Sequence, residues 1–149
     1  MNLFIELTAG SLMIGLTVII QAIGLDLIMK RGEILEKFLR RRTLKFWQPA
    51  FSAIIVTYIF ILHIINIWLW AFLYMAFDCL PVRGLSMALN FSTATYTTVG
   101  FNNVVLKPSD SLFTGIEAAN GLILMGWATA FIFELVSQIY RKEARALKD

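Results

Sequence analysis

The sequence predicts an all-α membrane protein with three transmembrane helices and a re-entrant half-helix between the second and the third. Three apolar runs are long enough to cross a bilayer, which takes about 20 residues of helix: Leu3–Met29, Ala50–Phe77 and Leu112–Tyr140. The intervening segment Cys79–Asp110 is less hydrophobic and contains proline, glycine and a cluster of Ser, Thr and Asn. It is too polar for a fourth span and too apolar in part for a simple loop.

The composition indicates a lipid-facing surface. Of the 149 residues, 58% are hydrophobic and 15% are charged, and the mean hydropathy is +0.73. A soluble domain carries about 25% charged residues. The first run is too long for the apolar core of a signal peptide and lacks a small-residue cleavage site, so we expect it to remain as structure.

Lys and Arg predict the orientation of the chain, because cytoplasmic loops carry an excess of these residues. They cluster after the first and third runs: Lys30, Arg31, Lys37, Arg40, Arg41, Arg42 and Lys45, then Arg141, Lys142, Arg145 and Lys148. Cys79–Asp110 contains only Arg83 and Lys107. We expect an integral membrane protein with the N-terminus and Cys79–Asp110 outside and residues 141–149 in the cytoplasm. The small size favours a prokaryotic inner membrane, and no nucleic-acid partner is expected.

Residues 30–48 allow two interpretations. Ile34, Leu35, Phe38 and Leu39 recur at helical spacing, with cations on the other side. Such a helix would lie along the cytoplasmic surface, with anionic lipids along Lys30–Lys45 as partners. The alternative is a cytoplasmic linker with the usual excess of positive charge.

The segment after Gly84 divides into two parts. Leu85–Tyr96 has the pattern of a short helix, which can go only halfway through a membrane, and the following residues 97–103 do not have a helical pattern. Non-helical backbone at membrane depth is tolerated only where it is buried in protein or lines a watery cavity. A half-helix and an extended segment between two spans form a re-entrant pore loop.

The residues at this point resemble a known family. Thr95–Phe101 reads TYTTVGF and resembles TVGYG, the filter signature of potassium channels. Thr98, Val99 and Gly100 match its first three letters, and Phe101 stands in place of tyrosine. The resemblance covers outer helix 50–77, pore helix 85–96, filter 97–103 and inner helix 112–140, and leaves residues 1–29 as an additional helix. It implies a tetrameric pore in which each subunit of a homotetramer contributes one pore helix and one selectivity-filter loop.

A cation filter needs oxygen atoms that replace the water around a dehydrated ion. Backbone carbonyls supply them when successive residues turn toward one axis, which requires alternating backbone conformations. Glycine enters the left-handed region freely, so Gly100 fits this requirement, and the Thr98 hydroxyl would add one more oxygen. The ion-conducting filter is therefore expected to comprise Thr97, Thr98, Val99, Gly100, Phe101 and Asn102.

Four positions around this filter depart from the family pattern. Phe101 lacks the hydroxyl with which tyrosine braces the filter. Asn102 replaces the second glycine, and asparagine enters the left-handed region at modest cost. Asn103 replaces the usual aspartate and is a candidate for filter support, while Ala94 stands where some members carry a carboxylate.

The expected function is a passive cation channel that prefers K⁺. One alternative is a weakly selective channel that also carries Na⁺, and Asn102 is the feature that would produce it. The other is a non-conducting pore-loop protein used for assembly or for regulating a partner. The sequence contains no Ser-His-Asp set, HExxH motif or Gly-rich nucleotide loop, so no enzyme activity, cofactor or metal beyond the permeant cations is expected. Any regulatory protein is unidentified.

Two acidic residues of the third run are functional candidates, because ionisable residues inside a span are costly. Glu117, near the outer end, could support a neighbouring filter by hydrogen-bonding its backbone, or could be hydrated at the interface. Glu134, in the inner half, could belong to a ring of carboxylates at the inner mouth. It could also pair with Arg141 or with a base of Lys30–Lys45.

Two glycines, one histidine and one cysteine have further structural or functional interpretations. Gly121 and Gly126 are either gate hinges, with Gly126 favoured, or sites of close helix packing, which is expected for at least one of them. His63 is expected to make a polar contact between helices rather than to bind a metal. Cys79 is the only cysteine, which excludes an internal disulfide.

Overall fold

The computed structural model describes residues 3–42, 46–80, 84–100 and 111–146 of the chain. These residues form four helices: α1 (Leu3–Arg42), α2 (Trp47–Ala76), α3 (Leu85–Tyr96) and α4 (Ser111–Ala146). Helices α1, α2 and α4 are each long and apolar enough to cross a membrane, and no strand occurs within the described ranges. The prediction of an all-α membrane fold is confirmed.

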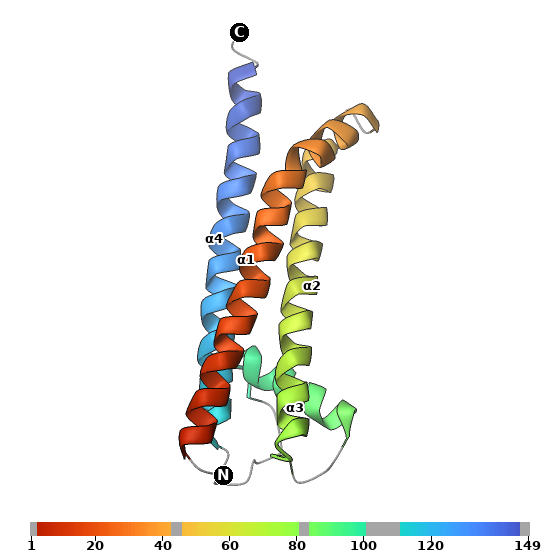
Figure 1. Ribbon diagram of the computed structural model, residues 1–149. Coiled ribbons are helices and arrows are strands. Elements are labelled where there is room, and N and C mark those ends of the chain that lie inside the picture. Colours follow the sequence, from red (N-terminus) through yellow and green to blue (C-terminus); the bar gives the residue numbers. More distant parts are fainter. Residues whose placement is uncertain (1–2, 43–45, 81–83, 101–110, 147–149) are drawn as a thin grey trace.

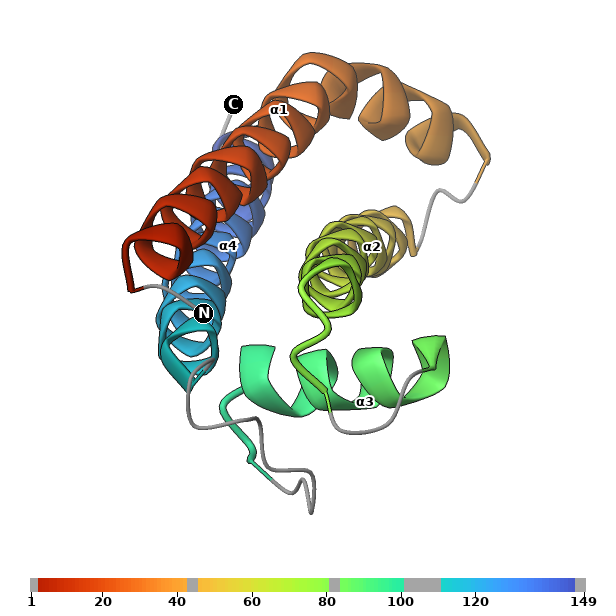
Figure 2. The same ribbon diagram turned by 60° about the horizontal axis from the view of Figure 1, so that its bottom comes forward.

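The three long helices form a bundle, and α3 lies across one end of it (Figure 1). Helices α1 and α4 run in one direction and α2 runs in the other (Figure 1). Helix α3 packs against α2 and α4, as the view from the end of the bundle shows (Figure 2). We call this end of the bundle the α3 end. The opposite end, where basic residues of α1 and α4 lie, is called the basic end.

Helix α1 is longer than the first apolar run. It continues past Met29 to Arg42 without a break, so residues 30–42 are helical and continuous with the first span, and their position along the membrane surface stays a prediction. The helix continues because Gly32 is the only helix-breaking residue there, and Glu33, Leu35 and Lys37 are strong helix formers. At 1.5 Å per residue, 40 residues span about 60 Å, roughly twice the hydrocarbon thickness of a bilayer. Its last turns bend over the start of α2 (Figures 1 and 2).

The other helix bounds lie close to those expected. Helix α2 begins at Trp47, three residues before Ala50, because Pro49 is tolerated in a first helical turn, where its missing N–H costs nothing. Helix α3 occupies the same residues as the expected half-helix, Leu85–Tyr96. Helix α4 starts one residue earlier than Leu112 and extends past Tyr140 to Ala146.

Small residues bring α1 close to the rest of the bundle. A Cβ atom at Gly10 would lie 2.7 Å from Cδ1 of Ile116 in α4, and one at Gly24 would lie 2.4 Å from Cδ1 of Leu62 in α2. Small residues at helix interfaces are the usual means by which membrane helices pack. Helix α1 therefore packs closely against both α2 and α4.

Buried polar side chains join α1 to the same two helices. Asn120 Nδ2 of α4 donates to Thr17 Oγ1 at 2.8 Å, and Asn66 Nδ2 of α2 donates to Gln21 Oε1 at 3.5 Å. All four side chains are buried. Hydrogen bonds between membrane helices average about 0.6 kcal/mol, so these two fix how α1 is seated more than they stabilise the fold.

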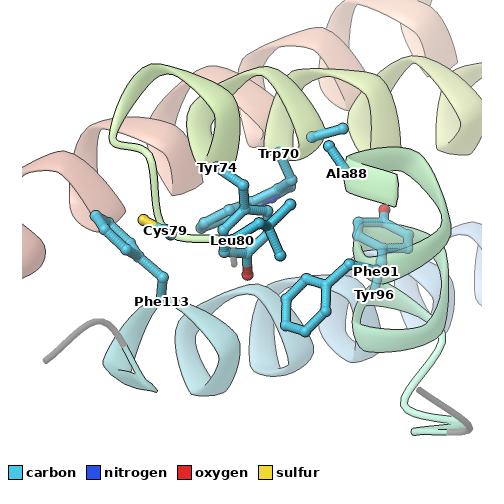
Figure 3. Close-up of a cluster of buried hydrophobic side chains, with 9 residues drawn as sticks. Trp70, Tyr74, Cys79, Leu80, Ala88, Phe91, Tyr96 and Phe113 are labelled. Carbon is cyan, nitrogen blue, oxygen red and sulfur yellow. The ribbon is translucent and has the colours of Figure 1, made fainter. Parts of the chain in front are cut away.

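One of two apolar cores in the described part of the chain lies at the α3 end, where aromatic side chains of α2, α3 and α4 gather (Figure 3). Tyr74 makes edge-to-face contacts with Phe91 and Phe113, with ring centroids 5.0 and 6.4 Å apart. Such pairs contribute about 0.5–1.5 kcal/mol beyond their burial. Cys79 is fully buried in this core, so its thiol is not at the surface of the subunit. The core holds α3 across the bundle.

Candidate functional site

The candidate site begins where α3 ends. The N–H groups of Thr97 and Thr98 donate to the carbonyls of Thr93 and Thr95 at 3.1 and 2.9 Å, and the N–H of Gly100 donates to the carbonyl of Ala94 at 3.1 Å. The chain after α3 therefore folds back onto the last turn of the helix. These bonds satisfy carbonyl groups that a helix end leaves without partners.

The backbone then alternates in handedness. Thr97 has a φ of −81°, Thr98 has +58° and Gly100 has +68°, while Val99 between them has no positive φ. For a β-branched residue such as Thr98 a positive φ is a true outlier, which costs about 1–3 kcal/mol. Strain of this kind persists mainly at functional sites. The alternation is the backbone pattern that turns successive carbonyls to one side.

The residues that follow α3 are uncovered in the single chain. Thr98, Val99 and Gly100 are exposed, and Val99 is 55% exposed although its side chain is apolar. The remaining expected filter residues Phe101 and Asn102, and the candidate support residue Asn103, lie outside the described residues. The described part of the segment thus leaves a surface that its own subunit does not cover.

Tyr96, the last residue of α3, is held from two sides. Its hydroxyl is hydrogen-bonded to His63 Nδ1 of α2 at 3.0 Å, so His63 makes a polar contact between helices. Its carbonyl lies against Gly121 of α4, where a Cβ atom would come 2.1 Å from the oxygen. Gly121 is therefore a site of close packing. The residue that directly precedes Thr97 is fixed by both flanking helices.

A buried carboxyl group joins three helices behind this point. Glu117 of α4 is fully buried. Tyr74 Oη of α2 donates to its Oε2 at 2.6 Å, and Ser92 Oγ of α3 lies 2.5 Å from its Oε1. Ser92 Oγ is also 2.9 Å from the carbonyl of Ile67. We call Glu117, Tyr74 and Ser92 the carboxyl cluster.

The carboxyl cluster excludes the hydrated interpretation of Glu117 drawn from the sequence, and support of a neighbouring filter stays a prediction. The side chain is not hydrated at an interface, because it has no exposed surface. It bonds to α2 and α3 of its own chain, and Ser92 lies one helical turn before Tyr96. Glu117 thus supports the helix that directly precedes residues 97–102, the expected filter, which we call the filter segment. Sequence reasoning missed Tyr74 and Ser92, and the one available signal was that Ser92, Thr95 and Tyr96 share a face of α3.

Glu134 and Gly126 lie farther along α4. Glu134 pairs with Arg141 Nη2 at 3.4 Å and accepts a hydrogen bond from Gln138 at 2.9 Å, so of its expected contacts the structure shows the pair with Arg141. This pair is more than half exposed and contributes about 0–1 kcal/mol. A Cβ atom at Gly126 would have no neighbour within 4 Å, so no close packing requires this glycine. A carboxylate ring at Glu134 and a hinge at Gly126 stay predictions.

The comparison with family models decides the family. A model described as "Ion channel" matches residues 50–138, more than half of the chain, and covers α3 and most of α2 and α4. The chain belongs to the potassium-channel pore family. It is an integral membrane protein and a subunit of a passive ion channel. Helix α1 lies outside the matched segment, so this channel adds one helix to the family's pore. Comparison with curated proteins and with solved structures finds no significant match.

Proposed function

We propose that the channel prefers potassium and works as a homotetramer. In this proposal, rings of backbone oxygens from residues 97–102 replace the hydration shell of K⁺. The alternating backbone at Thr97, Thr98, Val99 and Gly100 carries the proposal, because it is the conformation that a carbonyl filter requires. A strained threonine persists there because it directs a carbonyl toward the pore axis.

Helix α3 supports the same function. It ends directly before the filter segment, and the C-terminal end of a helix carries roughly half a negative charge. Four copies of this end around one axis would favour a cation beneath the filter. Anions and neutral molecules would not be attracted by this negative end.

The exposed residues after α3 support assembly. Val99 is an apolar residue with 55% of its surface exposed in one chain, and four copies would cover this surface with one another. A closed ring is the symmetric arrangement in which each copy contributes the same carbonyls to one axis. We therefore propose four equivalent subunits.

We also propose how the channel lies in a prokaryotic inner membrane. The basic end, with Arg31, Arg40, Arg41 and Arg141, faces the cytoplasm according to the positive-inside tendency. The α3 end and the N-terminus then lie outside. Helix α1 has no regular arginine repeat, so gating is proposed to come from the filter, the lipid or a partner protein.

Ion flux through the purified channel in liposomes tests the proposal. Under a potassium gradient, we expect K⁺ flux at least about tenfold above Na⁺ flux, a difference of about 1.4 kcal/mol in barrier height. Gly100→Ala should abolish both fluxes, because alanine disfavours the φ of +68° at this residue. A Cβ atom there would meet no neighbour within 4 Å, so the variant should elute like the wild type.

Other outcomes would change the proposal. If K⁺ and Na⁺ fluxes are equal and Gly100→Ala abolishes both, the protein is a weakly selective cation channel. Asn102 in place of glycine would be the cause of this weak selectivity. Flux that survives Gly100→Ala would refute the carbonyl filter. No flux from the assembled wild type, with or without membrane tension and across a range of voltages, would favour the non-conducting pore-loop protein.

A further inference from the structure

A groove runs between the second half of α1 and the first half of α2. It has a volume of about 630 Å³. Its walls are aliphatic and aromatic, with Leu27, Leu35 and Phe38 from α1 and Ile54 and Tyr58 from α2. Arg31 is the charged residue among the described residues that line it. We call this the α1–α2 groove.

The groove extends from the basic end toward the middle of the bundle. Ile54 and Tyr58 follow Trp47, the first residue of α2, by 7 and 11 residues. At 1.5 Å per residue these positions lie roughly 10 and 16 Å along the helix. A tryptophan at a helix end commonly marks the membrane interface. An occupant of the groove would therefore be apolar over a length that reaches into the hydrocarbon layer.

Among the described residues, one cation lines the groove and three more line a neighbouring hollow. Lys30 is paired with Asp26 at 2.6 Å, whereas Arg31 forms no ion pair with any residue that the structure describes. A second hollow, with a volume of about 580 Å³, is lined by Lys37, Arg40 and Arg41. A cation that borders an apolar groove favours a ligand with a negative head and an apolar tail.

Large apolar side chains connect the two hollows. Ile34 and Phe38 line both of them, and they are 66% and 56% exposed. A soluble surface would not present such side chains among four cations. The arrangement suits the boundary between headgroups and acyl chains, where apolar side chains point into lipid and cations meet phosphate. Figure 2 shows that the last turns of α1 bend over the start of α2, at the basic end.

We propose that the α1–α2 groove binds an anionic phospholipid, with an acyl chain between Leu27 and Tyr58 and the phosphate beside Arg31. The site lies on the additional helix, at the end of the bundle opposite the filter segment. It does not depend on which ion the channel conducts. A helix of a second subunit is a less suitable occupant, because it would place an apolar surface over Arg31 without supplying an anion.

Lipid retention on the purified full-length channel tests this proposal. We would measure it by native mass spectrometry after incubation with dioleoyl phosphatidylglycerol or dioleoyl phosphatidylcholine at equal concentration. The wild type should retain phosphatidylglycerol about fivefold better, the ratio expected for one basic side chain at an anionic headgroup. Arg31→Gln should reduce phosphatidylglycerol to the phosphatidylcholine level, and Ile54→Trp should reduce both lipids by filling the groove. Lys37→Gln removes the same charge outside the groove and should change neither.

Two results would overturn the proposal. Equal losses in Arg31→Gln and Lys37→Gln would mean that diffuse surface charge, rather than the groove, holds the lipid. Efficient bismaleimide cross-linking of Ile54→Cys between subunits, together with no retained lipid in the wild type, would show that a second copy fills the groove. Neither readout requires conduction, so failure here leaves the proposed function untouched, and loss of conduction leaves this proposal untouched.

Discussion

Replacing Glu117 with alanine is expected to lower the free energy of unfolding of the channel by about 2–5 kcal/mol, the usual cost of truncating a large buried side chain and leaving its hydrogen-bond partners unpaired. The change leaves the hydroxyl of Tyr74 without the acceptor it now has at 2.6 Å and opens a void between α2, α3 and α4. Because Ser92 holds α3 one turn before the filter segment, ion flux should also be lost. Denaturant titration in mixed micelles and liposome flux measure the two effects.

Glu117→Gln is the matched control for this change. A glutamine has the same shape, and its amide can accept from Tyr74 and donate to Ser92. Ser92 can then donate its single proton to the carbonyl of Ile67, 2.9 Å away. Stability should therefore stay within about 1 kcal/mol of the wild type. If alanine and glutamine variants were equally stable, the carboxyl cluster would not hold the helices together.

Gly121→Ala is expected to impair assembly and conduction strongly. The added Cβ atom would lie 2.1 Å from the carbonyl oxygen of Tyr96, and backbone cannot yield as a flexible side chain can. Overpacking in a tight core costs about 1–3 kcal/mol, and more where backbone must move. Because Tyr96 directly precedes Thr97, a shift of α3 would also move the filter segment. Size-exclusion chromatography and liposome flux report the loss.

Gly126→Ala on the same helix provides the comparison. Its Cβ atom has no neighbour within 4 Å, and alanine is about 1 kcal/mol better than glycine in a helix. This variant should assemble at least as well as the wild type. If Gly126 is a gate hinge, open probability should nevertheless fall, which single-channel recording would detect. Equal assembly defects at both glycines would contradict the packing assigned to Gly121.

The fold could be predicted because its signals are local. The length of each apolar run sets a span, and α3 occupies the expected residues because Gly84 and Gly100 bracket a short helical pattern. The end of α1 was misplaced for a physical reason. Hydropathy falls after Met29, but helix propensity does not, so the helix continues through the basic residues to Arg42.

The candidate site could be predicted only in part. The filter segment has a recognisable motif, and the requirement for alternating backbone follows from ion coordination. The partners of Glu117 could not be predicted, because Ser92 and Tyr74 are 25 and 43 residues away in the sequence. Which side chains meet there depends on how α2, α3 and α4 are seated on one another. The contact between Gly121 and Tyr96 depends on the same register.

The reversal potential of the purified channel in a planar bilayer tests the central claim most directly. With equal concentrations of K⁺ on one side and Na⁺ on the other, a potassium-preferring channel should reverse at least about 60 mV from zero, since tenfold selectivity for a monovalent ion corresponds to about 59 mV. The sign should be that of K⁺ as the more permeant ion. A reversal potential near zero in a channel that conducts both ions would contradict the account.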